Sequence, residues 1–245
     1  MRSITLFSLV SFVILSISAY QVDAQTMNWQ AERFIDQNDG AIQILRPPFD
    51  TTGSLGNDYQ IIEAYGNAFI GTPNGGAGNA GSWVKYEFTV PQGGDWYFWA
   101  RAISTSDADD SFYWGIDIAD ADAEANADTD KIDIWDFNEL DNCPLGECLV
   151  FPTDWLWFRL SARAAGPFPV GPTGQGIDYD NPIPLALTAG KHTLHIIGRE
   201  DGTFLDMIFA TMDAGFDANE DPLPIVAVEQ QGKLTTTWGN LKQAR

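Results

Sequence analysis

The chain has 245 residues and a formal net charge of −21 at pH 7, with 34 Asp and Glu against 13 Lys and Arg. Nucleic acid is excluded as a partner, because phosphate binding depends on Lys and Arg; the acidity suits calcium, cationic or neutral partners, or solubility alone. The 13% aromatic content and nine Trp exclude a disordered chain and predict one globular domain.

The N-terminus has the layout of a secretory signal peptide. Residues 4–19 are predominantly apolar but too short a run to span a membrane comfortably, and Ala24 supplies a small residue before a cut. We expect residues 1–24 to be a signal peptide cleaved after Ala24; an uncleaved membrane anchor is the alternative. No other segment is apolar enough for a transmembrane helix. The mature protein is therefore expected to be secreted, either extracellular or at the cell surface.

Short strands separated by turn residues follow along the chain. Apolar and polar residues alternate over 84–90, which predicts a half-buried strand, and the turn at 91–95 joins it to the next strand. Strands are predicted over residues 28–34, 68–71, 84–90, 96–103, 112–118, 155–160, 183–187, 192–197 and 203–211. Long loops are predicted over residues 36–59, 119–130, 138–153 and 164–182. Such a pattern is typical of an all-β sandwich or jelly roll with long loops.

The strand pattern ends near residue 213. One domain is expected over residues 25–215, followed by a linker and polar tail over residues 216–245. Disorder is the favoured interpretation of the tail, and a short sorting or docking tag for a protein partner is the alternative.

Cys143 and Cys148 are the chain's two cysteines. In an exported protein they are expected to form a disulfide that closes a small loop. Such a bond contributes modestly to global stability, because a short loop loses little closure entropy.

Three segments carry a family resemblance, and they occur in the expected order. They are QAERF at residues 30–34, GSWVKYEFTVP with GDWYFWAR over 81–101, and LTAGKHTL with REDGTFLDMI over 187–208. Together they resemble the galactose-binding-like jelly rolls of carbohydrate-binding modules, families six and thirty-five. The resemblance covers roughly residues 28–213 and implies a non-catalytic module that binds a polysaccharide or another glycan.

The resemblance also implies a structural calcium ion between the first and last strands. Its ligands would be Gln30, Glu32 and Asp206. Residues two apart on a strand point the same way, so Gln30 and Glu32 can converge on one ion, and calcium accepts carboxylate and amide oxygens. Gln30 stands where many relatives have Glu, which lowers the charge of the site. The alternative for the two acids is an ordinary surface or paired carboxylate.

In this family the sugar site lies on loops at one end of the sandwich. Sugars are bound by aromatic faces together with a few hydrogen-bonding groups. The family often has an Asn just before the last strand, but this chain has Thr203 and Phe204 there. The candidates for sugar contact are Tyr65, Asn67, Trp114, Trp135 and Asp201. Core packing is the alternative for each aromatic residue, and Trp96, Trp99 and Trp157 are expected in the core.

Residues 120–130 alternate acidic or amide side chains with small ones, which hints at a calcium loop. The segment lacks the Gly and Glu that an EF-hand loop requires. We interpret it as a solvated acidic loop, with a second calcium site as the alternative.

No catalytic arrangement is visible in the sequence. His192 and His195 are expected on opposite faces of one strand, and no Ser-His-Asp pattern or nucleophile elbow occurs. The protein is therefore expected not to be an enzyme. A structural or adhesive surface protein without sugar binding is the main alternative to a binding module. A small polysaccharide-active enzyme is the third possibility, because distances among the acids are unknown.

Overall fold

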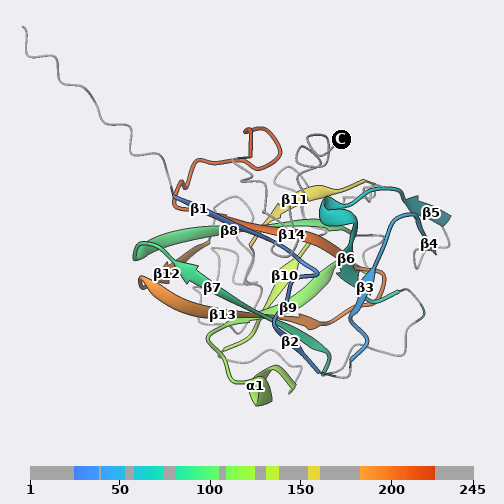
Figure 1. The fold of residues 1–245 in the computed structure, drawn as a ribbon, viewed down its shortest axis with the longest axis horizontal. Coiled ribbons are helices and arrows are strands. Elements are labelled where there is room, and N and C mark those ends of the chain that lie inside the picture. The colour runs from blue at the N-terminus through green and yellow to red at the C-terminus, as the bar shows by residue number, and fades with distance from the viewer. Residues whose placement is uncertain are drawn as a thin grey trace, which may run out of the picture.

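Two antiparallel β-sheets pack face to face in the computed structural model of the protein (Figure 1). The predicted all-β sandwich is therefore confirmed. The structure describes residues 25–38, 40–52, 58–73, 75, 81–104, 109–124, 131–137, 154–160 and 183–223. The predicted signal peptide, Cys143, Cys148 and the tail from residue 224 onward lie outside these residues. Within them, no helix is long and apolar enough to cross a bilayer.

Sheet A has seven strands, in the order β11-β8-β14-β6-β3, with β1 paired to β14 and β12 paired to β8. The strands are β1 (Thr26–Gln30), β3 (Gln43–Leu45), β6 (Phe69–Gly71), β8 (Gly94–Ile103), β11 (Leu156–Arg159), β12 (Pro184–Leu187) and β14 (Phe204–Thr211). The long pairing of β8 with β14 forms its centre.

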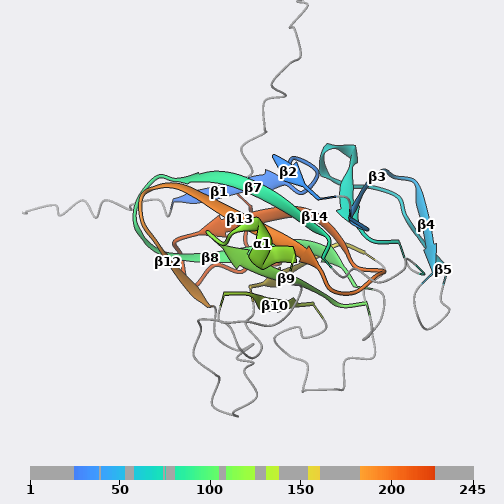
Figure 2. The same cartoon turned by 90° about the horizontal axis from the view of Figure 1, so that it is seen from below.

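Sheet B has five strands, in the order β10-β9-β13-β7-β2. They are β2 (Asp36–Gln37), β7 (Trp83–Val90), β9 (Ser111–Ile116), β10 (Asp133–Asp136) and β13 (Gly190–Gly198). A separate hairpin, β4 (Phe49–Thr52) with β5 (Asp58–Ile61), lies at the opposite end of the sandwich from β12 (Figures 1 and 2). The described helices are the 3-10 turn η1 (Tyr65–Asn67) and α1 (Asp120–Glu124).

The main core lies between the two sheets, and its residues alternate along each strand. Trp96 and Phe98 of β8 meet Tyr86 and Phe88 of β7 in this cluster. Because successive side chains of a strand point to opposite faces, Trp99 lies instead on the outer face of sheet A.

Every strand predicted from the sequence is present, with its ends moved by a few residues. The short strands β2 to β5 lie in the predicted loop 36–59, and β10 was also missed. The helix α1 lies in the predicted loop 119–130. Strand β1 ends at Gln30, so Glu32 lies in the following turn rather than on the strand.

A second apolar cluster covers the outer face of sheet A. There Trp99, Trp157 and Phe209 pack with Ala218, and Phe216 lies against them. The apolar side chains of Phe216, Ala218 and Leu223 thus pack on the sheet beyond the predicted boundary at residue 215.

Asn219 joins this docked segment to the edge of sheet A. Its Nδ2 donates to Trp157 O at 2.9 Å, and its Oδ1 accepts from Trp157 N at 3.0 Å. Strand β11 is at one end of the sheet order, so these backbone groups face away from β8. The Asn219 amide therefore satisfies them in place of a further strand, which blunts an open sheet edge.

Replacing Asn219 by Ala should lower the free energy of unfolding by about 1–2 kcal/mol, because two hydrogen bonds to buried backbone are lost. Urea denaturation followed by tryptophan fluorescence measures the change. The matched control is Glu220→Ala, since Glu220 is an exposed neighbour that leaves both bonds intact. A midpoint for Asn219→Ala equal to that of the wild type would show that the segment is not docked.

Candidate functional site

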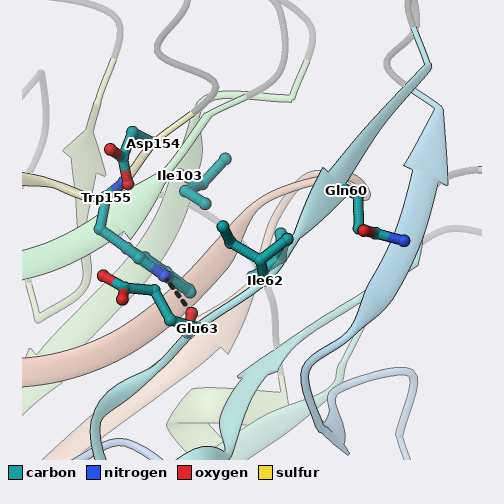
Figure 3. A pocket seen from close by; sticks show the side chains of 7 residues that line it. Gln60, Ile62, Glu63, Ile103, Asp154 and Trp155 are labelled. Atoms are coloured by element: carbon teal, nitrogen blue, oxygen red, sulfur yellow. Dashed lines mark hydrogen bonds between the residues drawn. The ribbon is translucent and has the colours of Figure 1, made fainter.

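A hollow of about 360 Å³ opens where the β4–β5 hairpin meets the sandwich (Figure 3). Its walls come from the end of β5 and the residues after it, from the end of β8 and from the start of β11. The lining residues are Gln60, Ile61, Ile62, Glu63, Ile103, Asp154 and Trp155. The hollow thus combines apolar side chains with carboxylate and amide groups.

Ile62 is the most exposed apolar side chain of this lining. Strand β5 ends at Ile61, which is only 2% exposed, and the next residue along the extended backbone points the other way. Ile62 is consequently 72% exposed. Figure 3 shows its side chain standing between Trp155 and Gln60. A large apolar group is therefore presented to whatever enters the hollow.

Trp155 forms the opposite wall and fixes the chain beside it. Its Nε1 donates to Glu63 O at 2.7 Å, the dashed line in Figure 3. Its ring packs edge-on against Phe69, with centroids 5.5 Å apart. The indole of Trp155 thereby helps to tie the backbone after β5 to the sandwich.

A second hollow, of about 510 Å³, runs along the hairpin and shares Gln60 with the first. It is lined by Asp50, Thr51, Thr52, Asp58 and Gln60. Gln60 Nε2 donates to Asp50 Oδ1 at 2.6 Å, and Thr52 Oγ1 donates to Asp58 Oδ1 at 2.7 Å. These cross-strand bonds hold the polar lining in place. The two hollows adjoin at Gln60, which lines both.

Arg101 of β8 contacts both the lining of the first hollow and a buried carboxylate. Its Nη2 lies 3.7 Å from Glu63 Oε1, and its guanidinium lies over the rings of Tyr65 at 4.7 Å and Trp155 at 5.3 Å. Its Nη1 donates to Asp206 Oδ2. The planar guanidinium suits such combined pairing and stacking.

Asp206 reaches Arg101 because strand β14 carries a bulge there. The register with β8 steps from Leu205, opposite Ala102, to Met207, opposite Arg101, so Asp206 is the extra residue. A bulge re-aims a side chain that regular pleating would place elsewhere. Asp206 is 0% exposed, and its Oδ2 also accepts from Tyr65 N at 3.2 Å.

Gln30 and Glu32 lie beside the same segment as Asp206. A Cβ placed on Gly66 would lie 2.8 Å from Gln30 Cδ and 2.9 Å from Glu32 Oε1, and Gly66 has a φ of 66° that favours glycine. The structure thus gathers all three predicted calcium ligands around η1.

Three oxygen atoms in this cluster have no hydrogen-bond donor among the described residues. They are Gln30 Oε1, Glu32 Oε2 and Asp206 Oδ1, and all three are buried. Buried oxygens without donors are costly, and calcium accepts carboxylate and amide oxygens, so the chemistry of this donor set fits the expected ion. No described group of three or more His, Cys, Asp or Glu is placed to hold a metal, and this trio has only two such residues.

The same burial changes the acidity of both carboxyls. It raises the pKa of Asp206 to about 6, although the charge and hydrogen bond of Arg101 oppose the rise. Burial also raises the pKa of Glu32, and the negative charge of Asp206 adds to that rise. A bound cation would favour the ionised form of both groups.

Two of the predicted sugar-contacting residues are in the core, which corrects their assignment. Trp114 is 2% exposed and Trp135 is 0% exposed, and both belong to the cluster between the sheets. Trp135 Nε1 donates to Arg159 O at 2.9 Å. Neither ring can stack on a sugar from this position, because their faces are covered by other core side chains.

The other three candidates are at the surface but line neither hollow. Tyr65 is 37% exposed and stacks with Arg101. Asn67 is exposed, and its backbone oxygen accepts from Arg46 Nη1 at 3.2 Å. Asp201 Oδ2 accepts from Gly75 N at 2.7 Å, which assigns it a role in holding that loop.

The residues of the first hollow were missed by sequence reasoning. Residues 36–59 were predicted as one loop, so the hairpin that presents Gln60 was not expected. The Ile61-Ile62 pair carries a usable signal: two adjacent apolar residues on an extended chain cannot both face the same core. Trp155 was placed at the start of a predicted strand without a role in binding.

No protein-family profile matches the sequence. No curated protein matches it either.

Several solved structures are similar to the chain. The C-terminal family 6 carbohydrate-binding module of a marine laminarinase from Zobellia galactanivorans is 15% identical, covering 76% of this chain and 99% of that one, with a TM-score of 0.37. A family 6 module from Cellvibrio mixtus lichenase 5A, in complex with cellotriose, is 15% identical over 76% and 97%, with a TM-score of 0.38. A family 35 module from Clostridium thermocellum is 11% identical over 76% and 98%, with a TM-score of 0.39. The TM-scores are below 0.5, so the fold is assigned from the strand pairing alone.

A buried carboxyl elsewhere, that of Asp110, lies beside the half-buried carboxyl of Glu200. Burial, with the nearby charge of Asp136 and the adjacent Glu200 side chain, raises the pKa of Asp110 to about 9. Glu200 Oε2 accepts from Asp110 N at 3.0 Å and from Ser111 Oγ at 2.7 Å. Glycosidase carboxyls stand about 5–9.5 Å apart to admit substrate or water, so this adjacent pair does not have that arrangement.

The raised pKa of Asp110 gives stability a definite pH dependence. The folded state holds a proton that the unfolded chain releases near pH 4, so this group's contribution to stability is lost as pH rises from about 4 toward 9. Asp110→Asn keeps a donor to Glu200 and cannot ionise. Relative to the wild type it should therefore be more stable at pH 8 than at pH 5, as measured by urea unfolding at both values.

The control is Asp95→Asn, which changes an exposed carboxylate at the start of β8. Its stability relative to the wild type should be the same at both pH values. A pH-independent difference for Asp110→Asn would contradict the raised pKa of Asp110.

Proposed function

We propose that the protein is an exported, non-catalytic module that binds a neutral polysaccharide in the two joined hollows, stabilised by calcium. The observation that carries the proposal is the lining of the first hollow, where exposed Ile62 and the indole of Trp155 stand among Gln60, Glu63 and Asp154. The export of the protein is inferred from the signal-peptide pattern of residues 1–24.

This lining matches the two chemical sides of a sugar ring. The C–H face of a pyranose is apolar and packs on aromatic or aliphatic side chains, whereas its hydroxyls need fixed hydrogen-bond partners. Ile62 supplies the exposed apolar contact, Trp155 lies largely buried beneath it with 7% of its surface exposed, and Glu63, Asp154 and Gln60 supply acceptors and a donor. The carboxylates disfavour an anionic sugar, so a neutral glycan fits best. The second hollow extends the polar lining, which favours a chain over a single sugar.

Calcium would be held by Gln30, Glu32 and Asp206 and would supply structural stability rather than chemistry. The support is the three buried oxygens without donors and the approach of all three side chains to η1. Bringing Glu32 and Asp206 together costs electrostatic repulsion that a divalent cation offsets.

Asp206→Ala should lower the melting temperature and abolish its dependence on calcium. A ligand at 100 times its Kd stabilises by about 2.7 kcal/mol, which corresponds to a rise of roughly 5–10 °C for a domain of this size. Thermal unfolding of wild type and variant, with calcium and with chelator, measures the effect. Asp95→Ala removes an exposed carboxylate and should keep the calcium response. A wild-type melting temperature indifferent to chelator would remove calcium from the proposal.

Ile62→Ser should weaken polysaccharide binding about tenfold or more without changing stability, because it removes exposed apolar surface from the hollow. A glycan array and a polysaccharide pull-down identify the ligand first, with calcium and with chelator. Calorimetry on the best ligand then gives the affinities.

The matched control is Ile35→Ser, which removes an equally apolar side chain that is 60% exposed and lines neither hollow. It should bind as the wild type does. Equal binding by all three proteins would place the sugar elsewhere on the molecule. A folded wild type that captures no glycan would leave a structural or adhesive role instead.

A further inference from the structure

We infer that Arg101 couples the cation site to the sugar-binding hollow, so that calcium and the polysaccharide strengthen one another's binding. The inference rests on the proposed function and adds a positioning residue and a mode of regulation to it. Arg101 touches groups of both sites and belongs to the ligand set of neither.

The first contact of Arg101 is with the carboxylate of Asp206, whose two oxygens have different surroundings. Asp206 Oδ2 accepts from Arg101 Nη1 and from Tyr65 N, whereas Oδ1 has no donor among the described residues. One oxygen therefore holds Arg101 while the other is available to a cation beside Gln30 and Glu32. A single buried side chain connects the two environments.

The second contact is with the wall of the hollow. The guanidinium of Arg101 lies over the ring of Trp155 and within 3.7 Å of Glu63 Oε1, and both residues line the hollow. The Arg101 side chain is only 14% exposed, so its contact with the buried Trp155 ring is shielded from water, whereas Glu63 is 72% exposed and its ion pair is a weaker surface one. Its position therefore affects the surface that the sugar meets.

The short segment from Glu63 to Gly66 is held from both sides. Its first residue accepts the indole N–H of Trp155, and its last lies against Gln30 and Glu32. Without a cation, Glu32 and Asp206 repel one another, which loosens this segment and the Arg101 contacts. Since each site orders the same segment, occupancy of one lowers the ordering cost at the other, and the coupling must be reciprocal.

The test follows the indole N–H of Trp155 by nitrogen-15 NMR during a calcium titration, with the resonance assigned from Trp155→Phe. This probe needs no sugar, so its outcome is independent of the proposed glycan binding. In the wild type, calcium should shift this resonance along a saturable curve. In Arg101→Lys, calcium should still bind, as measured by calorimetry, but the Trp155 shift should be largely lost.

Lysine is chosen because it keeps a positive charge beside the buried Asp206, so the fold is retained, but lacks the planar group that reaches Trp155 and Glu63. The matched control is Arg159→Met. Arg159 lies on the neighbouring strand with its guanidinium over Trp99 at 5.6 Å and lines neither hollow. This variant should give the wild-type Trp155 shift.

A second arm uses the polysaccharide identified by the array. Chelator should weaken its binding to the wild type by about fivefold or more, and to Arg101→Lys by less than twofold. The inference is overturned if calcium gives no binding heat or leaves the Trp155 resonance in place. It is also overturned if Arg101→Lys responds as fully as the wild type in either arm. Calcium-dependent movement of Trp155 in a protein that binds no glycan would reject the proposed glycan binding and the mutual strengthening, and would leave only the structural link through Arg101 between the cation site and Trp155.

Discussion

The ion pair between Asp206 and Arg101 is the interaction on which the functional end of this sandwich depends. Asp206 is fully buried, and a buried carboxylate that loses its partner destabilises a protein by about 3–5 kcal/mol. The bulge in β14 aims this carboxylate at the outer face of sheet A, where Arg101 meets it. Arg101 also contacts Glu63, Tyr65 and Trp155, and Asp206 accepts from Tyr65 N. The buried carboxylate of Asp206 therefore helps to position the segment that follows the hairpin.

The outer face of sheet A is an unusual feature of an otherwise regular sandwich. The main core lies on the inner face of sheet A, and the outer face carries two further apolar clusters. One is centred on Phe69 and Phe204, and the other on Trp99 and Trp157. The hairpin covers the first through Phe49, and residues 213–223 cover the second. The first hollow lies at the edge of the hairpin's cover. The hollow thus lies where the cover provided by the hairpin ends.

The sequence predicted the strands whose apolar residues are buried in the main core. Strand β7 alternates between apolar and polar residues, and β8, β13 and β14 are apolar-rich runs bounded by turn residues, so all four could be found. Gln30, Glu32 and Asp206 lie together around η1, and their role as calcium ligands stays a prediction. The hairpin could not be found, because its strands are short and stabilised by polar pairs such as Gln60 with Asp50. Trp114 and Trp155 look equivalent in sequence. Only the three-dimensional packing separates a ring between the sheets from one at the rim.

The charge of the hollows limits what they can hold more sharply than their shape does. Their lining contains Asp50, Asp58, Glu63 and Asp154 and no Lys or Arg. Arg101, the nearest guanidinium to Glu63, is already engaged by Asp206. Carboxylates accept hydrogen bonds from sugar hydroxyls strongly, because charge-assisted bonds exceed neutral ones. They also repel uronic acids and sulfated sugars. The same residues that would anchor a neutral glycan therefore exclude the anionic ones, and selectivity follows from the acidity that marks the whole chain.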